Sequence, residues 1–153
     1  MTTTIIQRLI QPYTKVTQLI NSLQPVALLA ARLYVAWVFF AAGLTKIKDW
    51  DSTLFLFEEE YHVPFIPFEL AAYLGTAGEI VLPILLVLGL AGRFSALGLS
   101  FINIIAVISL AEIAPAALYL HILWGVLLLQ ILLFSSDKIS VDKLIAIKLK
   151  NRL

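Results

Sequence analysis

The chain has 153 residues, of which 61% are hydrophobic and 14% are charged; its net charge is +1 and its mean hydropathy is +0.96. A soluble domain has about a quarter of its residues charged, so this composition excludes an ordinary soluble protein and indicates an integral membrane protein. The chain has no cysteine, which excludes a disulfide, an iron–sulfur cluster or a thiol relay built from its own residues.

Residues 1–24 place apolar and polar side chains on opposite faces of a helix. This pattern predicts an amphipathic helix lying on the cytoplasmic surface of the membrane, bent at Pro12; a poorly ordered tail is the alternative. The segment lacks the ordered regions of a cleavable signal peptide. The apolar face comprises Ile5, Ile6, Leu9, Ile10, Tyr13, Val16, Ile20 and Leu23.

Residues 25–134 contain four apolar runs. A bilayer core about 30 Å thick requires roughly 20 apolar residues in a helix, and only helices or closed barrels satisfy the backbone within lipid. We therefore expect an all-α protein, an integral membrane four-helix bundle. The predicted spans are Pro25 to Ile47, Phe68 to Ala91, Phe94 to Ala111, and Ala116 to Phe134.

The basic residues predict the orientation of this bundle. Arg93 lies in the short second connection, and residues 135–153 form a basic tail, whereas the first connection is rich in acidic residues. Because Lys and Arg accumulate on the cytoplasmic side, both termini are expected to be cytoplasmic, in a bacterial inner (plasma) membrane. No basic patch is interleaved with stacking aromatic residues, so a nucleic-acid partner is not expected.

The loop of residues 48–67 is expected on the outer face. Trp50 and Tyr61 flank a stretch that mixes aromatic residues with glutamates, and Pro64 and Pro67 then stop any helix. The pattern indicates a short amphipathic helix at the membrane surface. It serves either as a lid over a site between the spans or as an interfacial anchor.

Ionisable residues within the spans are the candidate site. Such groups cost several kcal/mol unless they are paired or hydrated, so each is a functional hypothesis. Arg32 and Lys46 share one face of the first span, and Glu79 lies in the second span between Gly78 and Pro83. Glu79 is expected to pair with Arg32 or Lys46. The pair either serves a function or fixes the register of the helices.

His121, early in the fourth span, is the remaining candidate. A neutral imidazole can bond to a quinone carbonyl, ligate haem or a metal, or satisfy another helix. The second histidine, His62, lies in the outer loop, and this spacing does not predict a metal site. Asn103 and Ser100 are expected to donate hydrogen bonds between helices. No nucleophile with an adjacent base is visible, so the residues alone do not establish an enzyme.

In several places the chain resembles DoxX/DoxD-type membrane proteins. The resemblance extends from about Ala30 to Lys143, but Phe134 to Lys138 departs from the Gly-Pro-Gly-like turn of many relatives. The matching features are the Arg-containing first span with Gly43, Leu44, Thr45 and Lys46; Gly78-Glu79-Ile80 through Leu88-Gly89-Leu90 to Arg93; His121; and Ser140-Val141-Asp142.

This resemblance implies a four-helix membrane bundle with a quinone-linked redox role. Its better-understood relatives are similar to the membrane subunit of a thiosulfate:quinone oxidoreductase, and others accompany thiol or oxidative-stress enzymes. It implies quinone as the cofactor and a protein partner that carries the redox centre. The family's polar positions correspond to Arg32, Lys46, Glu79 and His121.

Three hypotheses follow. In the first, the protein binds a quinone or similar amphipathic ligand between its spans: Arg32 and Lys46 stabilise negative charge, Glu79 relays protons and His121 bonds to a ring oxygen. In the second, it is a non-enzymatic anchor, scaffold or assembly factor for a partner protein. In the third, it is a small transporter with Glu79 at the midplane. The lipid bilayer is the surrounding partner in each, and a homo-oligomer is compatible with all three.

Overall fold

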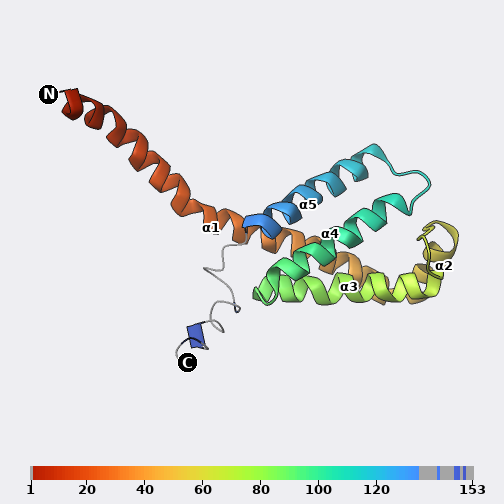
Figure 1. Ribbon diagram of the computed structural model, residues 1–153. Coiled ribbons are helices and arrows are strands. Elements are labelled where there is room, and N and C mark those ends of the chain that lie inside the picture. Colours follow the sequence, from red (N-terminus) through yellow and green to blue (C-terminus); the bar gives the residue numbers. More distant parts are fainter. Residues whose placement is uncertain (1, 135–140, 142–146, 149, 151–153) are drawn as a thin grey trace.

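The computed structural model describes residues 2–134, 141, 147–148 and 150. Within this part the chain forms five α-helices, and the all-α membrane fold is confirmed (Figure 1). Most of the predicted basic tail, 135–153, and two residues of the Ser140-Val141-Asp142 motif lie outside the described residues. The helices are α1 (Thr2–Lys48), α2 (Trp50–Glu59), α3 (Phe68–Leu88), α4 (Gly92–Ile108) and α5 (Pro115–Phe134).

The number of long helices differs from the prediction of four spans. By length and composition, α1, α3 and α5 are able to cross a membrane, whereas α4 has 17 residues and is a shorter apolar helix. The third predicted span was placed between Phe94 and Ala111, but its helix stops at Ile108. Ser109 follows as the C-cap, and its N–H donates to the carbonyl of Ile105.

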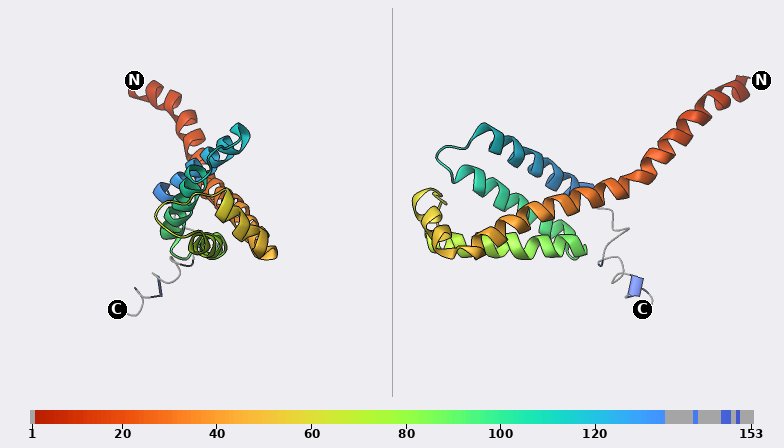
Figure 2. Two further views of the ribbon diagram at one scale, coloured as in Figure 1. Left: turned by 90° about the vertical axis from the view of Figure 1, so that its right-hand side faces the viewer. Right: turned by 180° about the vertical axis from the view of Figure 1, so that it is seen from behind.

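The N-terminal segment is not a separate helix. Residues 2–48 form one helix, although the sequence suggested a boundary near residue 24. Pro12 and Pro25 both lie inside it, and a proline removes one backbone hydrogen bond and bends a helix without having to end it. The first half of α1 projects away from the bundle (Figures 1 and 2). Its location at the cytoplasmic surface stays a prediction.

The helices α1, α3, α4 and α5 pack in a closed ring. α1 contacts α3 and α5, and α4 contacts the same two helices, while α2 covers one end against α3 and α1. The main hydrophobic cluster comprises Val35, Ala36, Phe39, Leu86, Ala96, Leu99, Leu128 and Ile131. Large apolar side chains such as Trp37 and Phe101 face outward, as expected where lipid replaces water.

The two ends of the ring are built differently. At one end α3 and α4 are joined by a tight turn in which Gly89 and Ala91 have positive φ values of 65° and 49°. At the other, which we call the α2 end, α2 and the loop after it fold over the helices (Figure 1). The loop is held by His62, whose N–H donates to the carbonyl of Ser109 at 2.8 Å, and by an isolated bridge between Tyr61 and Leu110.

Candidate functional site

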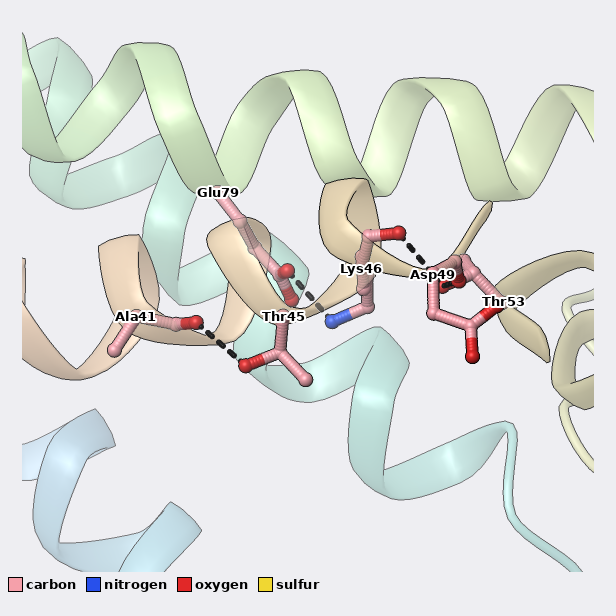
Figure 3. Close-up of polar contacts among 6 residues, drawn as sticks. All are labelled: Ala41, Thr45, Lys46, Asp49, Thr53 and Glu79. Atoms are coloured by element: carbon pink, nitrogen blue, oxygen red, sulfur yellow. Dashed lines mark hydrogen bonds and ion pairs between the residues drawn. The ribbon is translucent and has the colours of Figure 1, made fainter. Parts of the chain in front are cut away.

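An ion pair between α1 and α3 lies close to the α2 end. The Nζ atom of Lys46 is 2.6 Å from Oε2 of Glu79, and Figure 3 shows the two side chains pointing toward each other. Glu79 is buried, with 8% of its surface exposed. Of the two partners expected for Glu79, the structure therefore selects Lys46. Two charges held in bonding contact and shielded from water interact more strongly than a surface pair.

A glycine permits the close approach of α1 and α3 that forms this pair. A Cβ atom on Gly43 would lie 2.9 Å from Cδ1 of Ile80 and 3.1 Å from Cβ of Glu79. Pro83, one turn after Glu79 and inside α3, has no N–H for the carbonyl of Glu79. The small residue and the proline thus set the position of Glu79 against the neighbouring helix.

Side-chain hydrogen bonds fix the junction between α1 and α2 beside Lys46. The Thr53 hydroxyl donates to the carbonyls of Lys46 at 3.0 Å and Asp49 at 2.9 Å (Figure 3). Asp49 caps α2 by accepting from the N–H and the hydroxyl of Ser52, at 3.1 and 2.7 Å. These two bonds lower the pKa of the Asp49 carboxyl. α2 therefore starts at a defined angle to the end of α1.

A cavity of about 380 Å³ borders the ion pair. Its walls come from the end of α1, from α2 and the following loop, and from α3 and α4; its polar groups are few, and the rest is aliphatic and aromatic. The lining residues are Lys46, Phe57, Tyr61, Val63, Pro64, Ile66, Ala71, Leu74, Gly75, Glu79, Phe101, Ile102, Ile105, Ala106 and Ser109. An apolar pocket of this size with a small number of polar groups is typical of a small-molecule site.

Tyr61 is a residue of this cavity that the sequence did not identify as part of the site. Its ring packs on Phe57 with the centroids 5.0 Å apart, and partial burial, followed by the charges of Glu79 and Glu60, raises the pKa of its phenol. Tyr61 was expected to be a headgroup-level residue of the outer loop. The only local signal was its place just before two loop prolines, which does not reveal the contact with α4.

His121 forms a second polar contact, between α5 and α4. The Asn103 side-chain Nδ2 donates to the carbonyl of His121 at 2.9 Å, and Nδ1 of His121 lies 2.8 Å from Oδ1 of Asn103. The His121 carbonyl can only accept, so the NH₂ group of the Asn103 amide points toward it and the amide oxygen points toward the His121 ring. Nδ1 of His121 therefore carries the proton. Nε2 is then a hydrogen-bond acceptor. The His121 ring also meets the edge of Trp124, with centroids 4.9 Å apart.

The four predicted site residues do not converge on one place. Lys46 and Glu79 line the cavity, but Arg32 and His121 are not among its lining residues. Arg32 is buried on α1, on the face of Lys46 but fourteen residues earlier, which corresponds to about 21 Å along a helix. Shared helical phase thus placed both cations on one face but not at one depth. In the described part of the chain, no group of three or more His, Asp or Glu side chains is arranged to hold a metal.

Comparison with known proteins gives a family. No solved structure matches the chain. It is similar to a protein of Haemophilus influenzae that is described only as uncharacterized, with 30% identity over 129 residues, covering 78% of this chain and 83% of that protein. The DoxX family model matches residues 27–112, which include the whole of α2 and α3 together with Lys46 and Glu79. On these grounds the chain is a multi-pass membrane protein that belongs to the DoxX family.

Proposed function

We propose that this protein binds a quinone, or an amphipathic molecule of similar shape, in the cavity beside Lys46 and Glu79. In this role it is the membrane part of a quinone-linked redox system of the bacterial inner membrane, with both termini in the cytoplasm. The observation that carries the proposal is an ion pair in the wall of an otherwise apolar cavity within the membrane part of the protein.

The lining residues suit a ring with polar edges. Phe57 and Phe101 offer aromatic faces, and the aliphatic side chains offer apolar surface. Lys46 Nζ is a donor, Glu79 an acceptor, and the Tyr61 hydroxyl acts as either. A ligand with one or two ring oxygens can bond to these groups without leaving a buried charge unpaired, because Lys46 and Glu79 already satisfy each other.

The residues would perform binding and proton transfer. A bound quinone supplies the two-electron chemistry, which the side chains of this cysteine-free protein cannot provide. Lys46 would donate a hydrogen bond to a ring oxygen and favour negative charge there, while Glu79 and the Tyr61 hydroxyl would hold protons close by. The electrons would come from a partner protein that carries the redox centre.

Quinone retention tests the proposal directly. The protein is purified in mild detergent, its bound quinones are extracted and quantified by chromatography, and the amount is compared with that from Glu79→Gln. The wild type should retain quinone in a fixed ratio to protein. Glu79→Gln should fold normally but retain less quinone and lower quinone-dependent electron transfer in the partnered complex.

Fluorescence provides a second measurement with a matched control. Trp50 belongs to the apolar cluster that includes Phe57 of the cavity wall, so the double variant Trp37→Phe/Trp124→Phe leaves one tryptophan near the site. An added benzoquinone should quench Trp50 in a saturable way, and Glu79→Gln should weaken the quenching. Arg93→Gln, at the turn away from the cavity, should leave it unchanged. Absence of bound quinone together with non-saturable quenching would remove the proposal.

A second candidate function is a non-enzymatic anchor or scaffold for a partner protein. The projecting half of α1 favours it, because Tyr13, Val16, Leu19 and Ile20 are each more than half exposed there. In this case Lys46 and Glu79 hold the helices together, and Glu79→Gln would reduce expression and thermal stability first. The same variant therefore separates the two functions according to which property changes.

A further inference from the structure

We infer that the cavity takes its ligand sideways from the bilayer, between α3 and α4, and not from water through the loop at the α2 end. The inference rests on the proposed binding function and adds the class of ligand: a lipid-soluble molecule with a compact polar head and an apolar tail. It depends on which walls of the cavity reach the surface and which are held closed.

The wall formed by α3 and α4 reaches the lipid-facing surface. Leu74 of α3 and Phe101 of α4 both line the cavity, and 57% and 65% of their surfaces are exposed. Both lie within apolar helices; α3 is long enough to cross a membrane, and α4 is a shorter apolar helix. A tail leaving the cavity here would therefore pass between apolar side chains into lipid without crossing a polar surface.

The wall formed by the loop is held by several interactions. The backbone N–H of His62 donates to the Ser109 carbonyl at 2.8 Å, and Tyr61 forms a backbone bridge to Leu110. The loop is therefore tied to the end of α4. Val63 and Ile66 pack on the cluster formed by Phe57, Ala71 and Ala72. Opening this side would break hydrogen bonds and uncover apolar surface, whereas displacing Leu74 or Phe101 needs only side-chain rotation.

The position of the polar groups also fits entry from the side. Lys46 and Glu79 meet between α1 and α3, whereas Leu74 and Phe101 line the cavity from α3 and α4 and are exposed. A head bonded to the ion pair would leave its tail toward the α3–α4 surface. A ligand without a tail would forgo the apolar contact at Leu74 and Phe101.

The test uses the cysteine-free chain as its background. Gly75→Cys puts a thiol on the cavity wall, and a Cβ there would lie at an ordinary 3.6 Å from the Phe57 ring. Phe65→Cys puts one on the loop, at a fully exposed position outside the cavity lining. In nanodiscs, both variants are reacted with an alkyl methanethiosulfonate, which dissolves in lipid, and with a charged one, which does not. Relative to Phe65→Cys, Gly75→Cys should react faster with the alkyl reagent than with the charged reagent.

Blocking variants locate the route. In the Gly75→Cys background, Leu74→Trp should slow the alkyl reagent about tenfold, the effect of a barrier raised by about 1.4 kcal/mol. Val81→Trp is the matched control, because Val81 lies two turns further along α3 on nearly the same face and outside the cavity lining. It should leave the rate unchanged, as should Phe65→Trp on the loop, which is also outside the cavity lining.

Phe101→Trp places the same obstruction on α4. Because it only enlarges an existing ring, it can replace Leu74→Trp if that variant does not fold. A rate that neither Leu74→Trp nor Phe101→Trp reduces would overturn the lateral route. So would equal relative reactivity with both reagents. Neither result affects quinone retention. Conversely, if the protein retains no quinone but Leu74→Trp still slows the alkyl reagent, the redox proposal fails and the lateral route stands.

Discussion

Lys46 and Glu79 meet at 2.6 Å across α1 and α3, and they join two helices whose other contacts are largely apolar. Only 22% of the Lys46 side chain and 10% of the Glu79 side chain are exposed. The pair therefore joins the end of α1 to the middle of α3 and also forms part of a cavity wall. These two roles give different expectations for single and double variants.

Removing one partner should cost more than removing both. Lys46→Met leaves a buried carboxylate without its cation and should destabilise the fold by about 3 kcal/mol, whereas Lys46→Met/Glu79→Leu replaces the pair with apolar contact. Thermal unfolding in detergent should give a lower Tm for Lys46→Met than for the double variant. A single variant as stable as the wild type would show that the pair contributes no stability.

Gly43→Ala should loosen the contact between α1 and α3. The added Cβ would lie 2.9 Å from Cδ1 of Ile80, which can rotate away, and 3.1 Å from Cβ of Glu79, which moves only with α3. The helices should therefore separate by a few tenths of an ångström, at a cost of about 1–3 kcal/mol. The separation should also weaken the Lys46 contact and lower quinone retention. Gly75→Ala is the control, since its Cβ meets only the Phe57 ring at 3.6 Å. Equal unfolding temperatures for the two variants would contradict this account.

Asn103 should set the tautomer of His121. With Asn103 intact, ¹⁵N NMR of labelled histidine should show protonated Nδ1 for His121, while His62 in the loop serves as an internal reference. Asn103→Ala should remove this preference and cost about 1 kcal/mol, because a partly buried carbonyl and a ring nitrogen lose their partner. Ser100→Ala, on the same helix, removes only a bond to the Ala96 carbonyl and should leave the His121 spectrum unchanged.

Tyr61 should make the protein sensitive to alkaline pH. The pKa of its phenol is raised above the ordinary 10.0, first by burial and then by Glu79 and Glu60. A group whose pKa is higher in the folded state stabilises that state below its unfolded pKa, and this stabilisation is lost as the pH rises through the folded value. Unfolding measured from neutral pH upward should therefore show a smaller alkaline loss for Tyr61→Phe than for the wild type. Tyr119→Phe, on an exposed position of α5, should behave as the wild type does.

The sequence predicted the membrane helices well because their signal is local. The second predicted span begins at Phe68 as α3 does, and the fourth ends at Phe134 with α5. The end of α3 came three residues earlier than Ala91 because Gly89 takes the left-handed conformation and stops the helix. The boundary predicted near residue 24 did not appear, since neither Pro12 nor Pro25 ends α1.

The site was predictable only where helical phase and depth agree. The sequence predicted that Glu79 pairs with a cation of the first span, but it left both Arg32 and Lys46 open, because helical phase gives the face of a side chain and not its level. Arg32 has the right face but lies about four turns away, a distance that phase alone does not report. The cavity depends on the contact of Tyr61 with Leu110, between segments far apart in sequence, and no local pattern encodes such a contact.

The shortness of α4 has a consequence for the lipid around it. Its 17 residues extend about 25 Å, less than the roughly 30 Å of a typical hydrocarbon core. A bilayer meets such hydrophobic mismatch by thinning locally. Thinning beside α4 would draw the headgroups toward the membrane centre on the side of the exposed Phe101 ring, and a polar head would then have less depth to cross there.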